Sequence, residues 1–382
     1  MSESSLTAPL HELLRTTRLS SLLKDREVVS LDADCTVDEA LRTLSEHRLL
    51  AAPLRLDEAT AKSESLTGSP TPTVFLDIRD ILSSFMHDLG DELLRETPAM
   101  LTRMRRLEER GLAFAEQPVR RLHTIGGDGL LLDAAAAPDL TLDAALREGF
   151  LKGEVSGARA PDAGAAPPPG AAQPPARSVT HRLGLADSRG RVVGILSQTD
   201  VVRWLAGALR DFPALAGASV ASLGLGARRV EGVGAETPAL DALAAMRAAR
   251  VSALAVLGED GALIGNFSVS DLRSILAEHF GSLALPVGEF LAREHGTEYR
   301  GYAAQAEGDG PRHAFLAGRP ARPGADVGQE LVTCSASSTL ESVVAKLVKN
   351  GLHRLYVCDN DLRPVGVITL TDILRRVCLS RA

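Results

Sequence analysis

Hydrophobic and polar positions near the C-terminal end of the chain follow an order that predicts a strand and then a helix. Residues 331–334 form a short apolar run with the length of a strand. Apolar residues then recur at the spacing of an amphipathic helix: Leu340, Val343, Val344, Leu347 and Val348. Ser338 and Glu341 have capping-box spacing and predict where this helix begins, and Asn350-Gly351 predicts where it ends.

A hairpin and a second helix complete the pattern. Residues 355–358 and 365–369 are apolar and β-branched, and the acidic turn Asp359-Asn360-Asp361 lies between them. A last helix is predicted to open over 372–377. The segment therefore has the predicted order β-α-β-β-α.

The same order recurs elsewhere in the chain at a fixed spacing. In three places a residue near the start of the second strand is followed 19 residues later by an aspartate: His181 and Asp200, Ser252 and Asp271, and His353 and Asp372. Each place also has an apolar strand, a turn, a glycine-containing strand and a predicted helix start. Agreement of all these features indicates a structural repeat.

A degenerate first copy is predicted closer to the N-terminus. Helical spacing over 37–44 leads to the apolar run 50–54, which takes the place of the second strand. Residues 74–80 take the place of the last strand and the helix start. Leu50 and Asp80 are 30 residues apart, so the hairpin is longer here, and its Ser/Thr/Pro-rich stretch 57–73 is expected to be a surface loop.

The repeated segments resemble CBS domains, the cystathionine-β-synthase modules. In the last copy the resemblance is carried by His353-Arg354-Leu355, the acidic turn, Gly366-Val367-Ile368 and Thr369-x-x-Asp372. With four copies, the chain resembles the gamma regulatory subunit of AMP-activated and Snf-related protein kinases, on these phrases: AAPL (51–54), RVSALAVL (250–257), GNFSVSDLR (265–273) and NGLHRLYVCDND (350–361). The resemblance implies an α/β fold of four CBS repeats, arranged as two tandem pairs in a pseudo-symmetric disk with ligands in the clefts between paired repeats.

The repeats divide the chain into predicted regions. These are an N-terminal tail (1–18), repeat 1 (19–88), a linker helix (89–118), repeat 2 (119–210), repeat 3 (211–280) and repeat 4 (281–382). Repeat 2 carries an insertion at 152–177 that is rich in Pro, Ala and Gly, and repeat 4 carries a polar, Gly-rich insertion at 293–327. Neither composition buries enough apolar surface to offset the entropy of ordering, so the first is expected to be disordered and the second flexible.

Charge and composition narrow the classes of function. The formal net charge is −7, which argues against a nucleic-acid partner because such a protein needs a basic face. No apolar run approaches the ~18 residues of a membrane span. The four cysteines lack Cys-x-x-Cys spacing and are expected to be buried thiols in a reducing compartment. Glu3 and Glu12 lie in an N-terminal stretch without an apolar core, so we expect no secretory signal, while a transit peptide stays open; the expected location is cytoplasmic or nuclear.

The Ser/Thr-x-x-Asp spacing at each last helix has two interpretations. An aspartate near a helix start caps the helix and interacts favourably with its dipole, and for a single copy this is the simpler interpretation. The same carboxylate can accept hydrogen bonds from both hydroxyls of a ribose, with the Ser or Thr reaching the same ligand. Repetition at a fixed distance favours ligand binding for these candidates: Ser197 and Asp200, Ser268 and Asp271, and Thr369 and Asp372.

Histidine and arginine at the start of the second strand are candidate phosphate ligands. His181-Arg182 and His353-Arg354 stand in the same register of two repeats, and arginine donates charge-assisted hydrogen bonds to phosphate. One such pair is ordinarily explained as polar residues at a strand edge, whereas two in register favour a shared phosphate site. Repeat 3 has Ser252-Ala253 there, with Arg250 as the nearest cation in the sequence. In the family that the chain resembles, the phosphates gather near the central axis, where these pairs meet.

Repeat 1 departs from this pattern. Leu50 stands where the resemblance places a cation. Asp77 replaces the Ser or Thr and adds repulsion for a phosphate. We therefore expect no tightly bound nucleotide on Asp80.

The chain is expected to be a regulatory protein and not an enzyme. It has no P-loop, G-x-S-x-G or H-E-x-x-H motif and no paired Cys/His metal spacing. The resemblance implies that AMP, ADP or ATP binds as a regulatory ligand, without a metal or redox cofactor. It also implies a heterotrimer with a kinase catalytic subunit and a scaffold (beta) subunit. The alternative is a stand-alone CBS-pair protein that regulates another enzyme or a transporter through an adenosine ligand.

Overall fold

The structure is a computed structural model of the chain. It describes residues 3–23, 27–55, 75–95, 99–123, 129–133, 140–151, 180–187, 191–295 and 331–379. The predicted loop at 57–73 and the predicted insertion at 152–177 lie outside the described residues, as does most of the predicted insertion at 293–327.

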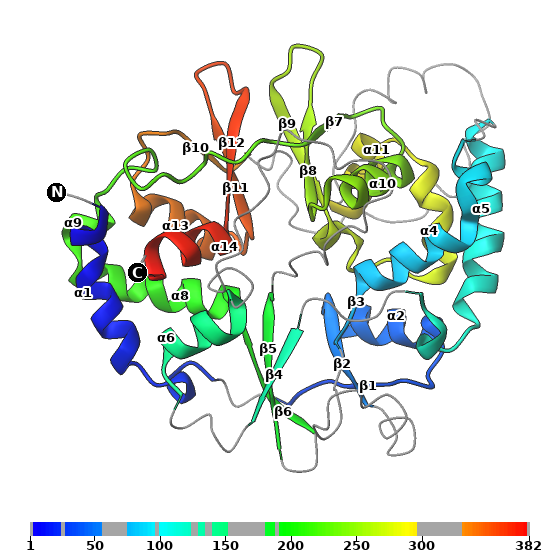
Figure 1. The fold of residues 1–382 in the computed structure, drawn as a ribbon. Helices are drawn as coiled ribbons and strands as arrows, with labels where there is room; N and C mark the ends of the chain where they lie inside the picture. Colours follow the sequence, from blue (N-terminus) through cyan, green and yellow to red (C-terminus); the bar gives the residue numbers. More distant parts are fainter. Residues whose placement is uncertain are drawn as a thin grey trace, which may run out of the picture.

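Four repeats with the order β-α-β-β-α confirm the predicted α/β fold (Figure 1). Repeat 1 consists of β1 (Leu31–Asp32), α2 (Val37–Glu46), β2 (Ala51–Arg55), β3 (Phe75–Asp77) and α4 (Ile78–Arg95). Repeat 2 consists of β4 (Gly129–Asp133), α6 (Leu142–Ala144) with a π-helical continuation (Ala145–Phe150), β5 (Arg182–Ala186), β6 (Val192–Ser197) and α8 (Gln198–Ala208).

Repeats 3 and 4 have the same order of elements. Repeat 3 consists of β7 (Gly232–Gly234), α10 (Ala239–Ala249), β8 (Ala253–Leu257), β9 (Leu263–Ser268) and two 3-10 segments (Val269–Leu272 and Ala277–Ala284). Repeat 4 consists of β10 (Thr333–Cys334), α13 (Leu340–Lys349), β11 (Arg354–Cys358), β12 (Pro364–Thr369) and α14 (Leu370–Ile373) with a π-helical continuation (Leu374–Cys378). The final helix predicted for repeat 3 is thus 3-10 in the structure.

Further helices flank the repeats. They are α1 (Glu3–Thr16), α5 (Met100–Ala115), α9 (Pro213–Ala216) and α11 (Val287–His295), with 3-10 turns at Leu19–Ser21, Val119–Arg121 and Leu209–Asp211. Within the described ranges, no helix combines the length and the apolar character that crossing a bilayer requires.

Each repeat has its own three-stranded sheet. The first strand pairs in parallel with the second, and the third pairs antiparallel with the second. In repeat 4, Cys334 lies opposite Val357 and Leu355 lies opposite Ile368. Parallel neighbours need a crossover connection, which is why a helix separates the first two strands, whereas a hairpin joins the antiparallel pair.

Hydroxyl side chains fix where the first helix begins in repeats 1, 2 and 4. In repeat 1, Glu39 N–H donates to Thr36 Oγ1 at 3.2 Å and Thr36 N–H donates to Glu39 Oε2 at 2.8 Å, a complete capping box. In repeat 4, the prediction that Ser338 begins the helix is wrong by one residue, because Thr339 caps α13. The Ser338 hydroxyl instead accepts a hydrogen bond from Ser335 N–H at 3.0 Å within the preceding turn.

The segment that leads into each repeat crosses to the neighbouring repeat. Residues at the starts of these segments form reciprocal antiparallel bridges with the residues that begin the neighbour's first helix: Arg18 with Thr141, Pro118 with Thr36, Ser219 with Thr339, and Pro286 with Pro238. Repeats 1 and 2 therefore exchange their leading segments, and so do repeats 3 and 4. This exchange confirms the predicted arrangement in two tandem pairs.

Hydrophobic cores join the two pairs to each other. One core combines repeats 1 and 3 with α5 and α11, and in it the ring centroids of Phe85 and Phe280 are 4.6 Å apart. A second core combines repeats 2 and 4 with α1 and α9. A smaller cluster, which includes Ala255 and Tyr356, joins the sheets of repeats 3 and 4. The four repeats therefore close into a disk, with the sheets toward the middle and the helices on the outer sides (Figure 1).

Two segment boundaries differ from the predicted ones. Residues 1–18, predicted as a tail, include α1, whose Leu10 and Leu14 are fully buried in the second core. His11 Nε2 also lies 3.1 Å from the carbonyl oxygen of Val377, so α1 is tied to the end of repeat 4. Helix α11 extends to His295, and residues 293–295 therefore belong to a helix that packs in the first core.

Candidate functional site

The final helix of repeats 2, 3 and 4 begins with one shared geometry. In repeat 4, Thr369 Oγ1 donates to Asp372 Oδ2 at 2.6 Å, and Asp372 N–H donates to Thr369 Oγ1 at 3.2 Å. The same hydroxyl–carboxylate bond, at 2.6 and 2.8 Å, joins the equivalent pairs: Ser197 with Asp200, and Ser268 with Asp271. The capping interpretation therefore accounts for Oδ2 of each aspartate, and the ligand-binding interpretation concerns Oδ1.

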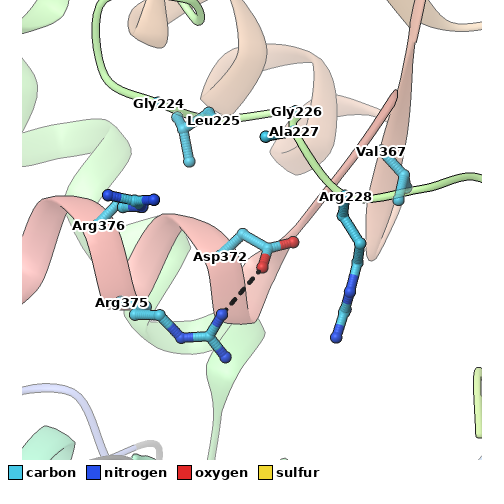
Figure 2. Close-up of a pocket in the computed structure, with 9 residues that line it drawn as sticks. All are labelled: Gly224, Leu225, Gly226, Ala227, Arg228, Val367, Asp372, Arg375 and Arg376. Carbon is cyan, nitrogen blue, oxygen red and sulfur yellow. Dashed lines mark hydrogen bonds and ion pairs between the residues drawn. The ribbon is translucent and has the colours of Figure 1, made fainter. Parts of the chain in front are cut away.

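Asp372 lines a pocket of ≈ 240 Å³ (Figure 2). Its lining comes from the segment leading into repeat 3 and from repeat 4: Gly224, Leu225, Gly226, Ala227, Arg228, Val367, Asp372, Arg375 and Arg376. Arg375 Nη1 lies 3.5 Å from Asp372 Oδ1, and Arg228 and Arg376 stand on either side of the carboxylate (Figure 2). Three guanidinium groups beside one carboxylate make the pocket electropositive, which suits an anionic ligand.

Two glycines allow the wall of this pocket to approach β12. Gly226 has φ of +76°, a conformation that side chains with a Cβ rarely adopt. A Cβ on Gly366 would overlap the carbonyl oxygen of Gly226, and a Cβ on Gly226 would lie 2.6 Å from Val357 Cγ2. Sequence reasoning missed this wall, whose visible signal is the glycine spacing of Gly224 and Gly226 ahead of Arg228.

Arginines from three repeats surround His353. Burial, and then the neighbouring guanidinium groups of Arg354, Arg182 and Arg273, lower the pKa of His353 to about 4. These residues come from repeats 4, 2 and 3, so charges from three repeats act on His353. His353 is neutral at pH 7, and the positive charge there resides on the arginines.

His181 lies in a similar environment. Burial, and then Arg79 and Arg182, lower its pKa to about 4. Gln198 connects His181 to repeat 4. Its backbone N–H donates to the carbonyl oxygen of His181 at 3.1 Å, and its Oε1 accepts a hydrogen bond from Thr371 at 3.0 Å. The first turns of α8 and α14 are therefore joined by a hydrogen bond next to His181.

Arg354 and Arg182, each at the start of the second strand of its repeat, contact the other repeat of the same tandem pair. Arg354 Nη2 donates to Ser252 Oγ of repeat 3 at 2.9 Å. Burial lowers the pKa of Arg354, and the Asp271 carboxylate of repeat 3 opposes this shift. In the other pair, Arg182 Nη1 lies 3.3 Å from Asp77 Oδ2 of repeat 1. Arg354 thus faces the helix start at Asp271, and it does not line the pocket of Asp372.

Arg250, the predicted cation of repeat 3, differs from the strand arginines in its exposure. It ends α10 with φ of +54° and has an exposed side chain. Arg273 takes the position beside Asp271: burial and Arg182 lower the pKa of Arg273, while Asp271 raises it. Sequence reasoning also missed the arginines three residues after two of the aspartates: Arg203, whose Nη1 lies 2.9 Å from Asp200 Oδ1, and Arg375. Their shared Asp-x-x-Arg spacing was the available signal.

Comparison with known proteins agrees with this architecture. The family described as the CBS domain matches residues 226–278 and 325–378, which are repeats 3 and 4. The chain is 30% identical over 207 residues to 5'-AMP-activated protein kinase subunit gamma-3 of Sus scrofa, an alignment that covers 53% of this chain and 34% of that protein. It is 24% identical over 362 residues to Protein SDS23 of Meyerozyma guilliermondii, covering 90% of this chain and 56% of that protein. The chain thus spans about a third to about half of the length of these relatives.

A solved structure has the same fold along nearly the whole chain. It is a protein of Methanocaldococcus jannaschii described as a proposed archaeal homologue of g-AMPK, with a TM-score of 0.55 and 16% identity, covering 94% of this chain and 99% of that one. The match to the CBS-domain family thus lies in repeats 3 and 4, and the likeness in fold extends to four repeats in tandem pairs. The chain's resemblance to the gamma subunits of AMP-activated protein kinase, expected from the sequence, is confirmed.

Proposed function

We propose that this chain is an adenine-nucleotide-binding regulatory subunit of gamma type in a Snf-related or AMP-activated protein kinase complex. The observation that carries the proposal is the pocket of repeat 4, where the Asp372 carboxylate and three arginines line one space of ≈ 240 Å³. That volume is slightly below the ~300–1,000 Å³ of most small-molecule sites. It suits a compact, charged ligand.

The groups at the pocket match the parts of a nucleoside monophosphate. Asp372 Oδ1 can accept hydrogen bonds from the two ribose hydroxyls, while Oδ2 stays bound to Thr369. Arg228, Arg375 and Arg376 supply donors and charge for a phosphate. The apolar side of Leu225 and Val367 is available to a flat base.

A second position of the same kind supports the proposal. Asp271 lies beside Arg273 and Arg354, and both arginines are partly buried. A buried guanidinium group without a tight carboxylate partner favours binding of an anion. We propose AMP, ADP or ATP as the ligand of these positions, in a role that is regulatory and not catalytic.

Regulation requires that different nucleotides favour different arrangements of the disk. A ligand shifts such an equilibrium only by its differential affinity for the two states. Charges of arginines from three repeats act on His353, so a ligand phosphate near this histidine would interact with several repeats at once. The number of phosphates would then determine how tightly the pairs are held together.

Calorimetric titration of the full chain with AMP, ADP, ATP and S-adenosylmethionine tests the ligand proposal. We expect saturable binding of at least one adenine nucleotide and weaker binding of S-adenosylmethionine, which carries no phosphate. Absence of heat with all three nucleotides would contradict the proposal.

The proposed partners are a kinase catalytic subunit and a scaffold (beta) subunit, in the cytoplasm or the nucleus. Affinity purification of the tagged full chain from its own cells, followed by mass spectrometry, should recover both. The alignment with Protein SDS23 supports a second candidate, because it covers 90% of this chain whereas the gamma-3 alignment covers 53%. That candidate is a CBS protein that regulates another enzyme or a transporter, and recovery of no kinase would favour it.

A further inference from the structure

Asp77 stands in repeat 1 at the position of the capping hydroxyl in the other repeats. Thr369, Ser197 and Ser268 each donate a hydroxyl hydrogen to the helix-start aspartate at 2.6–2.8 Å. An aspartate has no hydrogen to donate when ionised, and Asp80 already accepts from Asp77 N–H at 2.9 Å. Two carboxylates in this arrangement repel each other, so the Asp77 side chain needs other partners.

The Asp77 carboxylate binds two arginines of the central cluster, which we define as Arg79, Arg182, Arg273 and Arg354, the arginines that act on His181 and His353. Its Oδ1 accepts from Arg79 N–H at 2.9 Å and from Arg79 Nε at 3.1 Å. Its Oδ2 lies 3.3 Å from Arg182 Nη1. The residue is 5% exposed, and the arginines hold its pKa below the usual value although burial acts in the opposite direction. Asp77 is therefore an ionised, buried carboxylate between cations.

The other pair of repeats shows what this position is like without the carboxylate. There, the equivalent strand arginine Arg354 donates to the neutral hydroxyl of Ser252 at 2.9 Å. No internal carboxylate forms an ion pair with Arg354 within 4.0 Å among the described residues. Arg182 and Arg354 thus occupy matching positions, but an internal anion binds only the first this tightly.

We propose that the Asp77 carboxylate is a built-in competitor for ligand phosphate, which occupies Arg182 and Arg79 and restrains the anion affinity of the central cluster. The inference rests on the proposed function only for the identity of the competing ligand. It also assigns a role to repeat 1, which would act as an internal counter-ion and not as a nucleotide site. The affinity for highly charged ligands is restrained most, since each phosphate interacts with the same negative charge.

Replacing Asp77 tests the proposal with inorganic pyrophosphate as the probe. Asp77→Thr supplies the hydroxyl that repeat 4 has in Thr369, and Asp77→Asn keeps the size of the side chain if the threonine variant folds poorly. Removing one negative charge from beside Arg182 should tighten pyrophosphate binding by about ten- to a hundredfold in calorimetry. Pyrophosphate should also raise the melting temperature of either variant more than that of the wild type.

Two further variants make the result specific. Asp143 forms an ion pair with Arg147 at 2.9 Å, and neither residue belongs to the cluster. Asp143→Asn should therefore leave pyrophosphate binding as in the wild type. Asp77→Thr combined with Arg182→Gln should lose the gain. Unchanged pyrophosphate affinity in both Asp77 variants, or a gain that survives Arg182→Gln, would overturn the proposal.

Titration with adenosine, AMP and ATP separates this inference from the proposed function. We expect Asp77→Thr to leave the affinity for adenosine unchanged, because adenosine has no phosphate. The variant should bind AMP more tightly than the wild type does, and the gain in affinity should be larger for ATP. If pyrophosphate binding improves while no variant binds any adenine nucleotide, the internal counter-ion stands and the nucleotide proposal fails. An equal gain for adenosine and ATP would overturn the counter-ion, because a competitor for phosphate cannot affect a ligand that has none.

Discussion

Arg354 of repeat 4 donates a hydrogen bond to Ser252 of repeat 3 at 2.9 Å. Ser252 holds, in repeat 3, the position that His353 holds in repeat 4. This hydrogen bond holds the Arg354 guanidinium group against repeat 3. Burial lowers the pKa of Arg354, and the Asp271 carboxylate of repeat 3 opposes that shift. The strand arginine of repeat 4 therefore contacts repeat 3. Under the proposed function, a phosphate at Asp271 would be bound by both repeats of the pair.

Arg354→Gln should separate phosphate from ribose recognition. The variant removes the guanidinium group and its charge and leaves a polar side chain, so we expect AMP binding to weaken by about tenfold or more and adenosine binding to change little. Calorimetry with both ligands measures the difference. Arg191→Gln is a suitable control, because Arg191 pairs with Asp187 on the surface and is 66% exposed. Equal losses for AMP and adenosine would contradict a phosphate role for Arg354.

Gly366→Ala should damage the pocket wall. The added Cβ overlaps the Gly226 carbonyl oxygen, so the segment leading into repeat 3 must move away from β12. We expect a loss of about 1–3 kcal/mol in the free energy of unfolding, together with weaker AMP binding. Chemical denaturation and calorimetry measure these quantities.

Gly207→Ala is the matched control for Gly366→Ala. Gly207 lies in α8, and a Cβ there would meet nothing within 4 Å. Gly207 lies in the last turn of α8, so this change should stabilise the protein by about 0.5 kcal/mol or less and leave AMP affinity unaltered. Wild-type stability and affinity in Gly366→Ala would show that the wall is not held as described.

The two central histidines should make stability depend on pH. Burial and neighbouring arginines lower the pKa of His181 and of His353 to about 4, so the unfolded chain binds more protons than the folded one between about pH 6.5 and pH 4. Their contribution is fully present above about pH 6.5 and is lost as the pH falls toward 4. Each histidine should contribute a slope of about 1.4 kcal/mol per pH unit within that window.

Denaturation of the wild type and of His353→Gln across this pH range measures the slope. The variant should lose the contribution of one histidine and show a flatter dependence. Saturating AMP should also flatten it, because a phosphate beside His353 favours the protonated ring and raises its pKa in the folded state. An identical slope in wild type and variant would contradict the environment described for His353.

Local sequence signals predicted the repeats well. The 19-residue spacing from His353 to Asp372 and its copies reflects one strand, one hairpin and one helix start, and the structure has these elements in that order. The Thr369–Asp372 geometry was also predictable, since capping chemistry is local. Apolar periodicity likewise predicted α13, apart from a shift of one residue in its cap.

Contacts between distant segments were not predictable from such signals. Nothing local shows that the segment at Gly226 lies on Gly366, or that Ser219 pairs with Thr339 instead of with its own repeat. Arg250 is the cation nearest to Ser252-Ala253 along the sequence, but the charged groups that interact with Asp271 include Arg273 and Arg354, and Arg354 comes from another repeat. Periodicity specifies which face of an element is buried but not which partner buries it.

AMP titration of Asp372→Ala beside Asp80→Ala tests the central claim most directly. Both changes remove a helix-start carboxylate that accepts a backbone hydrogen bond, at 2.9 Å in each case, so both should cost about 1 kcal/mol of stability. Only Asp372 lines the pocket with three arginines. The account predicts that Asp372→Ala weakens one AMP-binding event by about thirty- to a thousandfold, the loss of two charge-assisted hydrogen bonds, while Asp80→Ala binds AMP as the wild type does. Wild-type AMP affinity in both variants, with lowered melting temperatures, would contradict it and leave Asp372 as a helix cap alone.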